Sequence, residues 1–265
     1  MQPMMINTQY IDIHAHLLPG LDDGPPDWQT AIDLCRCLAD DGITAAIATP
    51  HQLGRYDNQT RCADILAMTQ QLNDRLSEHN IALTVYPGAE VRLDERIGRL
   101  LRQGRLLTLT DSGVYLLLEL LPEVAVDLRP FIAGLIEQGI TPVIAHVERY
   151  PYLLRRPQEA AALLAAGAVL QVTASSLVGI FGRSVQGLAW RLLSTGGAAV
   201  VASDAHNTAG RAPRMAQAYQ QIARRLCPHA ADRLCRDNPQ RILDGRALKP
   251  LPNDSSLNTA VRFRR

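Results

Sequence analysis

The stretch Tyr-Ile-Asp-Ile-His-Ala-His, residues 10–16, contains the pattern that decides the fold. It begins as a short, largely apolar run of the length of a buried β-strand, and it ends in the pair His14 and His16. Imidazole is the commonest metal ligand among protein side chains. This segment therefore predicts a strand whose end carries metal ligands, and the same unit recurs along the chain.

Further apolar runs alternate with helical segments. The other predicted strands are residues 42–48, 83–90, 114–119, 141–145, 169–173 and 198–203. The predicted helices are residues 28–41, 60–79, 128–138, 157–166 and 185–194, three of which are followed by a glycine suited to a helix end. Strands that alternate with helices indicate a parallel sheet covered by helices. We therefore expect an α/β fold with seven strands, and an open or closed barrel is favoured over a doubly wound sheet.

The domain organisation is simple. Residues 1–247 contain no linker rich in Pro, Gly or Ser, so we expect a single domain there. Residues 248–265 are rich in proline and polar residues and end in Arg-Phe-Arg-Arg. We interpret this segment as a loosely held polar and basic tail, with a basic docking peptide as the alternative.

Composition restricts the class of protein. The chain has 265 residues, 47% hydrophobic and 20% charged, with a formal net charge of +1. These fractions are typical of a globular protein, and the small charge provides no general attraction for nucleic acid or anionic lipid. We expect no nucleic-acid partner and no membrane insertion, since no apolar run approaches the roughly 18 residues that a membrane helix needs. Five scattered cysteines and an N-terminus without a signal-peptide pattern favour a cytoplasmic location.

Ligand-type residues stand at the carboxyl ends of six of the seven predicted strands. They are His14, His16, His51, Glu90, Glu119, His146, Asp204 and His206. In a βα barrel these ends meet at one mouth, and mixed imidazole and carboxylate ligands suit divalent transition metals. Any one of these residues has an ordinary structural alternative, such as capping or packing, but their joint placement favours a metal site. Asp23 adds a carboxylate in the following loop, although Asp22 and Asp23 are also typical turn residues before Gly24.

A cysteine phosphatase is the competing hypothesis. Cys227 and Arg233, like Cys235 and Arg241, satisfy the bare Cys-x5-Arg pattern. That chemistry requires a thiolate in a loop of backbone N–H groups between a strand and a helix. The intervening residues contain no glycine and follow no predicted strand. The sequence therefore favours the metal site.

The motifs together resemble a known superfamily. They are Asp-Ile-His-Ala-His (12–16), Asp-Asp-Gly (22–24), Ala-Thr-Pro-His (48–51), Pro-Gly-Ala-Glu (87–90), His-Val-Glu-Arg-Tyr (146–150), Val-Thr-Ala-Ser-Ser-Leu (172–177) and Ser-Asp-Ala-His-Asn (203–207). In order and spacing they resemble the polymerase-and-histidinol-phosphatase (PHP) superfamily. The nearest resemblance is to the bacterial capsule and exopolysaccharide protein tyrosine phosphatases of the CpsB/YwqE type, over residues 10–214. Val147 stands where that family usually has proline, which should affect loop rigidity more than chemistry.

The resemblance implies a fold and a metal centre. The fold would be a distorted, TIM-like (β/α)7 barrel. Three divalent ions are implied, with manganese expected and iron, cobalt or zinc as alternatives. Their ligands would be His14, His16, Glu90 and Asp204 for the first ion, Glu90 (bridging), Glu119 and His146 for the second, and Asp23, His51 and His206 for the third. Asp12 would either orient a ligand or be an internal polar residue of the barrel.

The resemblance also implies an activity. Arg149 and Arg211 match arginines that bind substrate phosphate, with a structural salt bridge as the alternative role. The implied enzyme is a protein tyrosine phosphatase in which metal-activated hydroxide attacks phosphorus. Its implied substrate is phosphotyrosine on the tail of a bacterial tyrosine autokinase of polysaccharide export. The alternatives are a histidinol phosphatase or another small phosphomonoesterase, a phosphodiesterase, and a non-catalytic metal-dependent regulatory protein.

Overall fold

The computed structural model describes residues 9–122, 126–156 and 158–251. Every strand pairing in this part of the chain is parallel. One sheet has the order β1-β2-β4 and the other the order β3-β5-β6-β7-β8-β9. The strands are β1 (Tyr10–Ala15), β2 (Ile43–Ala48), β3 (His51–Gln52), β4 (Thr84–Pro87), β5 (Glu90–Arg92), β6 (Tyr115–Glu119), β7 (Thr141–Ile144), β8 (Val169–Thr173) and β9 (Val200–Ala202).

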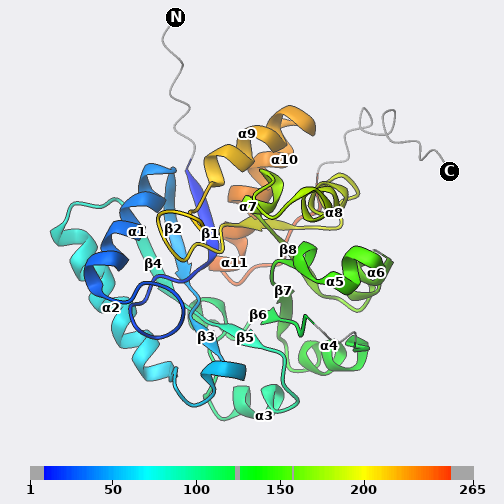
Figure 1. Ribbon diagram of the computed structural model, residues 1–265. Helices are drawn as coiled ribbons and strands as arrows, with labels where there is room; N and C mark the ends of the chain where they lie inside the picture. Colours follow the sequence, from blue (N-terminus) through cyan, green and yellow to red (C-terminus); the bar gives the residue numbers. More distant parts are fainter. Residues whose placement is uncertain (1–8, 123–125, 157, 252–265) are drawn as a thin grey trace, which may run out of the picture.

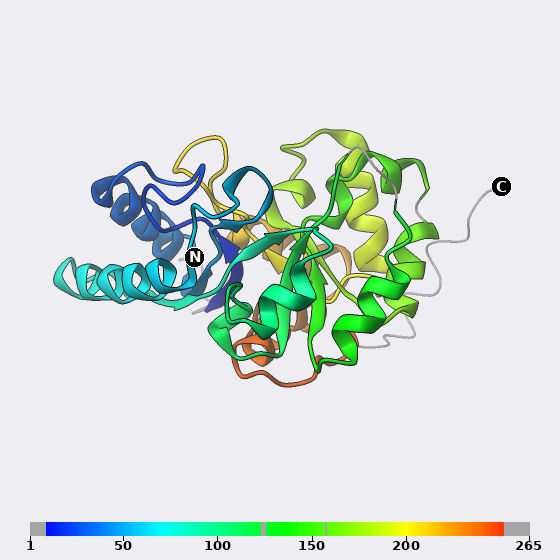
Figure 2. The same ribbon diagram turned by 90° about the horizontal axis from the view of Figure 1, so that it is seen from below.

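Helices surround these strands (Figures 1 and 2). They are α1 (Trp28–Asp40), α2 (Cys62–Glu78), α3 (Ile97–Arg102), α4 (Arg129–Ile136), α5 (Pro151–Arg155), α6 (Gln158–Ala165), α7 (Ala174–Leu177), α8 (Arg183–Ser194), α9 (Met215–Arg225), α10 (Pro228–Asp232) and α11 (Asn238–Leu243). Short turns of other helix types are η1 (Gly54–Tyr56), η2 (Leu109–Asp111), η3 (Val147–Arg149) and η4 (Arg233–Asp237). The five helices expected from sequence are present with slightly different ends. The parallel α/β architecture is therefore confirmed.

The described residues form nine strands rather than the expected seven, because one expected strand is divided and one further strand was not expected. Residues 83–90 form β4 and β5, and β3 follows β2 after Thr49 and Pro50. Proline lacks the N–H group that a ladder requires. At the other interruption Gly88 packs so tightly that an added Cβ would lie 2.7 Å from the Cγ2 atom of Ile47. The chain bends at both places, and each bend transfers it from the three-stranded to the six-stranded sheet.

A separate apolar cluster lies between strands of both sheets. It includes Ile13 from β1, Ile47 from β2, Leu117 from β6 and Val143 from β7, all fully buried. Ile242 of α11 packs into the same cluster. Since α11 contacts β1 and β9, this helix covers one end of the strands. The polar residues described below lie at the opposite end, where the carboxyl ends of the strands meet.

The two sheets also meet beyond β1 and β9. A parallel bridge joins Ala15 to Ala205, and the Asp204 N–H donates to the His14 carbonyl at 2.8 Å. Fully buried Asp12 reinforces this junction, since its Oδ1 accepts from the N–H groups of His14 and Ser203. Asp12 thus fixes the backbone that carries two expected ligands.

The beginning of the expected tail lies against the domain. Lys249 exchanges two hydrogen bonds of 3.0 Å with the buried side chain of Asn238. Residues 252–265 lie outside the described residues, so the boundary at residue 247 stays a prediction. Among the described helices, none combines the length and apolar character required to cross a membrane.

Candidate metal centre

The structure brings all nine expected ligands to the carboxyl ends of the strands. Glu90 lies at their middle. Its Oε2 atom is 3.3 Å from Nε2 of His14, 3.4 Å from Nε2 of His16 and 3.2 Å from Nδ1 of His51. Its Oε1 atom is 2.9 Å from Nε2 of His146. Because its two oxygens face different imidazoles, Glu90 has the position of a bridging carboxylate.

Two further carboxylates extend the cluster. Asp204 Oδ1 lies 3.3 Å from Nε2 of His14 and 3.6 Å from Nδ1 of His206. Asp23 Oδ1 lies 3.3 Å from Nε2 of His206 and 3.4 Å from Nε2 of His51. Asp23 therefore lies within reach of two of the clustered imidazoles.

Glu119 completes the set at the side of His51. Its Oε2 atom is 3.7 Å from Nδ1 of His51, and its Oε1 atom is 2.6 Å from an Nη atom of Arg92. Sequence reasoning missed Arg92, which lies two residues after Glu90 in β5 and stands in no motif of the sequence.

Three groups of ligand atoms lie close enough to hold an ion, each within 4.8 Å of one another. The groups are His16, Asp23, His51 and His206; His14, His16 and Asp204; and His51, Glu90 and Glu119. They overlap strongly with the three ligand sets implied by the family resemblance. They differ in that His16 and His51 each belong to two groups, and His146 reaches the centre through Glu90.

Two of these ligands have unusual backbone angles. His146 has φ 33° and Asp204 has φ 54°, both in the left-handed region. A residue other than glycine in this region is strained, and such strain persists where surrounding contacts hold it. Each residue lies two positions after the end of a strand, β7 for His146 and β9 for Asp204, so the sharp turn places the side chain over the strand ends.

Buried polar partners orient the imidazoles. The Oδ2 atom of Asp22 lies 2.6 Å from Nδ1 of His16 and accepts the His51 N–H at 3.0 Å. Gln171 of β8 accepts the His146 N–H at 2.9 Å, and the same Oε1 atom is 3.1 Å from Nδ1 of His14. Such partners fix which ring nitrogen faces a metal. Sequence reasoning treated Asp22 only as a turn residue and missed Gln171, although the polar side chain in an otherwise apolar strand was a signal.

The electrostatics keep the carboxylates ionised. Burial opposes ionisation of Glu90, but His14 and the ring nitrogens hydrogen-bonded to the carboxylate lower its pKa. Burial likewise opposes ionisation of Asp204, yet His14 and Arg149 lower its pKa. Hydrogen bonds from His206 and His51 lower the pKa of Asp23. Glu119 differs, because burial and the neighbouring Glu90 raise its pKa.

The surroundings shift the pKa values of the histidines in opposite directions. Burial alone would lower the pKa of His16, but the Asp22 carboxylate overcomes it and raises the pKa to about 10. Burial, assisted by Arg149, lowers the pKa of His146 to about 4. Burial, assisted by His16, lowers the pKa of His206 to about 4. The last two rings are therefore neutral at pH 7, as metal ligands must be.

The residues present fit a group of divalent ions. The Nδ1 atom of His146 is buried without a hydrogen-bond partner among the described residues. Ionised carboxylates and neutral imidazoles packed this closely form a donor set of the kind that transition metals bind. Bound cations would also balance the negative charge that the cluster concentrates.

Both expected arginines lie at the centre. Arg149 Nη1 is 2.6 Å and Arg211 Nη2 is 2.9 Å from Oδ2 of Asp204. The Arg149 guanidinium also lies over the Phe181 ring, 5.1 Å from its centroid. On another side of the centre, the Tyr56 ring stacks on His51 at 5.3 Å. Cationic and aromatic side chains therefore border the ligands.

The cysteine-phosphatase hypothesis is wrong on geometry. Cys227 begins α10, where its sulfur accepts the Ala230 N–H, and it follows a helix rather than a strand. Cys235 is fully buried within η4, and burial raises the pKa of its thiol. Neither cysteine lies in a strand-to-helix loop of the kind that a cysteine phosphatase needs.

A parallel α/β fold with clustered imidazoles, carboxylates and guanidinium groups at its strand ends defines a protein with a candidate multi-metal centre. Comparison with known proteins identifies the family. The chain belongs to the family described as "Capsular polysaccharide synthesis, CpsB/CapC", which matches residues 10–244.

Individual relatives of this chain are named as tyrosine-protein phosphatases. Tyrosine-protein phosphatase YwqE of Bacillus subtilis (strain 168) is 38% identical over 206 residues, which are 76% of this chain and 79% of YwqE. The putative tyrosine-protein phosphatase CapC of Staphylococcus aureus is 31% identical over 203 residues, which are 76% of this chain and 78% of CapC. A solved structure from work on YwqE of Bacillus subtilis and CpsB of Streptococcus pneumoniae, described as unique metal-dependent tyrosine phosphatases, superposes with a TM-score of 0.86. It is 32% identical and covers 91% of this chain and 96% of its own.

Proposed function

We propose that this chain is a metal-dependent tyrosine-protein phosphatase, a phosphoric monoester hydrolase. Membership of the CpsB/CapC family and the names of its relatives support this function. The observation that carries it is the position of Arg149 and Arg211, both bonded to Asp204. The same carboxylate contacts the imidazole of His14. Cations suited to a substrate phosphate thus lie directly beside candidate metal ligands.

The proposed cofactors are three divalent ions, with manganese first and iron, cobalt or zinc as alternatives. The candidate ligand groups support three sites, with His16 and His51 each in two groups and Glu90 in contact with His16 and His146. When bound, the ions would supply Lewis acidity and make water nucleophilic at neutral pH.

The chain's own residues position the substrate. Asp204 already holds Arg149 and Arg211 toward the centre, so little reorganisation is needed when a phosphate arrives. Their guanidinium groups form charge-assisted hydrogen bonds with phosphate oxygens and neutralise the charge that grows there during attack. A phenol leaves with an ordinary pKa near ~10, so it needs less help from an acid than an alkyl alcohol does.

We further propose that both sheets form one distorted seven-stranded barrel. If β2 continues into β3 and β4 into β5 through their bends, the nine strands of the described residues reduce to seven. The shared apolar cluster and the bridge between Ala15 and Ala205 support this description. A cytoplasmic location is also proposed, supported by the five free cysteines.

The proposed substrate is phosphotyrosine on a protein, with the tail of a bacterial tyrosine autokinase of polysaccharide export as the expected partner. The family description, capsular polysaccharide synthesis, supports this partner. Histidinol phosphate and other small phosphomonoesters remain the alternative substrates.

A substrate comparison tests the function. A phosphotyrosine peptide, histidinol phosphate and a phosphodiester are each incubated with the Mn²⁺-loaded protein, with and without chelator. The proposal predicts the highest kcat/KM for the peptide and loss of all turnover on chelation. Faster turnover of histidinol phosphate would overturn the substrate while leaving the metal centre intact.

A further inference from the structure

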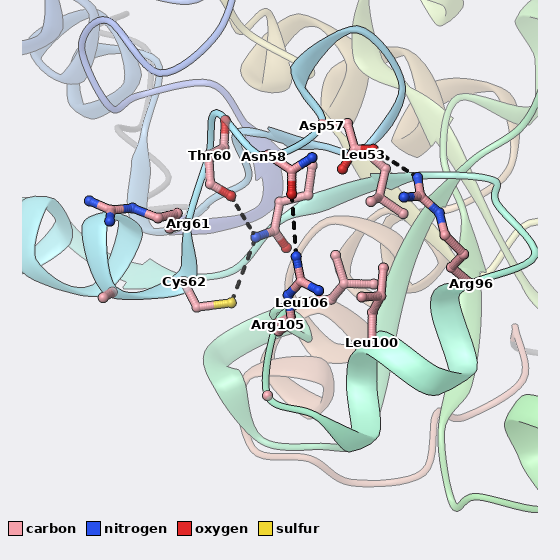
Figure 3. Close-up of a pocket in the computed structure, with 13 residues that line it drawn as sticks. Leu53, Asp57, Asn58, Thr60, Arg61, Cys62, Arg96, Leu100, Arg105 and Leu106 are labelled. Carbon is pink, nitrogen blue, oxygen red and sulfur yellow. Dashed lines mark hydrogen bonds and ion pairs between the residues drawn. The ribbon is translucent and has the colours of Figure 1, made fainter.

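A pocket of about 330 Å³ lies next to η1, and its lining includes Leu53, Asp57 and Asn58, which flank that turn in the sequence. We call it the arginine pocket and define it by Leu53, Asn58, Arg96, Leu100, Arg105 and Leu106. Figure 3 shows the Arg105 guanidinium inside it, next to the amide of Asn58, with Leu100 and Leu106 close by. The pocket thus combines a cation with an apolar floor.

Arg105 is the cation available to a ligand. Its Nη2 atom donates to the neutral Asn58 amide at 3.3 Å, and no carboxylate of the described residues forms an ion pair with it. Arg96, by contrast, is held by Asp57 at 2.9 Å and Asp94 at 2.8 Å. The charge of Arg96 is therefore already neutralised, and its side chain forms one side of the pocket lining.

Neighbouring arginines strengthen the positive field. Arg99 and Arg102 stand between Arg96 and Arg105 at intervals of three residues, and both are exposed. Arg102 donates to the neutral Gln138 amide at 2.9 Å. Within residues 9–122, 126–156 and 158–251, Arg99 and Arg102 form no ion pair with a carboxylate. Since the whole chain has a formal charge of only +1, this is a local concentration of positive charge.

One short loop separates the pocket from the metal centre. Tyr56 stacks on the candidate ligand His51, and the next residue, Asp57, binds Arg96 of the pocket. Gly54 packs on Arg92, where an added Cβ would lie 3.0 Å from the Arg92 Cγ atom. A peptide in extended conformation advances about 3.3 Å per residue. Residues a few positions from a phosphotyrosine at the metals would therefore reach the pocket.

We propose that the arginine pocket binds an acidic side chain of the peptide substrate, a few residues from the phosphotyrosine. The proposal rests on the proposed function and adds a sequence preference to it. The carboxylate would pair with Arg105 and accept from the Asn58 amide, while its methylene groups pack on Leu100 and Leu106. An apolar floor beneath a single open guanidinium suits a glutamate side chain better than a small inorganic anion, which would leave the leucines in water.

The test compares three phosphotyrosine peptides that differ only in flanking residues: glutamate, glutamine or lysine. Wild type should have the highest kcat/KM for the glutamate peptide, through a lower KM. Arg105→Glu should lower kcat/KM for this peptide about tenfold, as expected when attraction becomes repulsion at a partly exposed ion pair. The same variant should prefer the lysine peptide. Arg224→Glu, at an exposed position of α9 away from the pocket, is the matched control and should behave as wild type.

Two further readouts separate the pocket from the proposed activity. Turnover of free phosphotyrosine, which has no flanking residues, should be the same in Arg105→Glu and wild type; a loss there would assign Arg105 to the catalytic centre and overturn the pocket. Binding of a fluorescent, unphosphorylated glutamate peptide should weaken in Arg105→Glu but not in Arg224→Glu. Equal binding by both variants would overturn the pocket, whereas absence of all phosphotyrosine hydrolysis with normal peptide binding would overturn only the activity.

Discussion

At the scale of single residues, the pair Asp22 and His16 shows how the centre is prepared for metal. The short contact between Asp22 and Nδ1 leaves Nε2 of His16 facing Glu90. Without metal this carboxylate raises the pKa of His16 to about 10, far above its unperturbed value of about 6.5. The protonated pair therefore stabilises the metal-free fold fully below about pH 6.5, and this stabilisation disappears as the pH rises toward 10. Metal binding needs the neutral ring, so metal affinity should rise with pH across the neutral range.

Asp22→Asn tests this role. At pH 7.5 the wild-type protein should release a proton from His16 when Mn²⁺ binds, whereas the variant, with a lower His16 pKa, should release fewer. Calorimetric titration in buffers of different ionisation enthalpy measures the difference. Affinity should also fall by about 10- to 100-fold, the usual effect of losing a partner that orients a ligand. Unchanged proton release would show that Asp22 does not control His16.

Arg149 gives a second prediction. Arg149→Ala removes one of two guanidinium groups at Asp204 and should lower kcat for a phosphotyrosine peptide by about 10²- to 10³-fold. Arg149→Lys should recover part of the loss, because it keeps the charge but not the bidentate geometry. Circular dichroism and metal content control for folding. Activity within twofold of wild type in Arg149→Ala would assign the residue a purely structural role.

Eight of the nine candidate ligands could be predicted because they stand at the ends of predicted strands that meet at one edge, whereas Asp23 lies in a loop and was expected as a ligand from the family resemblance. The roles of Asp22 and Arg92 could not be predicted, since they depend on contacts between distant segments, whereas Gln171 left a signal as a polar side chain in an otherwise apolar strand. Asp22 meets His51 only when the first loop folds over β3. Arg92 meets Glu119 only through the pairing of β5 with β6.

At the scale of elements, the two bends between the sheets distinguish the structure from a regular alternation of strand and helix. Residues 83–90 were predicted as one strand from their mostly apolar character. The interruption arises from packing of Gly88 against Ile47, which local patterns do not contain. The helices α9 to α11 also lay outside the predicted repeat, because they follow the last predicted strand and no further strand alternates with them.

Gly88→Ala tests the bend. The new Cβ would lie 2.7 Å from fully buried Ile47, so the variant should lose about 1–3 kcal/mol of unfolding free energy. Because Glu90 lies two residues further on, metal affinity should fall as well. Chemical denaturation of the metal-free protein measures the first effect. Gly134→Ala, in α4 where nothing lies within 4 Å, is the control and should gain about 0.5–1 kcal/mol. Equal stability of Gly88→Ala and wild type would contradict a tight bend.

At the scale of the whole molecule, the metal centre joins strands from both sheets. β1 contributes His14, while β5 and β6 contribute Glu90 and Glu119. Bound ions should therefore stabilise the entire fold, by about 2.7 kcal/mol for each site at a free concentration 100 times its Kd. The melting temperature should rise with Mn²⁺ concentration.

Glu90→Gln tests whether one carboxylate links the ions. Mass spectrometry of metal content should find about three equivalents in wild type, as the three ligand groups predict. Since Glu90 contacts four imidazoles, the variant should lose more than one equivalent and most of the thermal stabilisation. Glu78→Gln, exposed at the end of α2, should retain wild-type binding. Loss of a single equivalent would rule out the bridging role.

The most direct test of the central claim is phosphate release from a phosphotyrosine peptide by one preparation, measured before chelation, after chelation and after addition of Mn²⁺. A variant carrying both Cys227→Ser and Cys235→Ser is measured alongside. We predict that chelation abolishes release, that Mn²⁺ restores it, and that the cysteine variant behaves as wild type throughout. Release that survives chelation but disappears in the cysteine variant would contradict the metal-dependent mechanism.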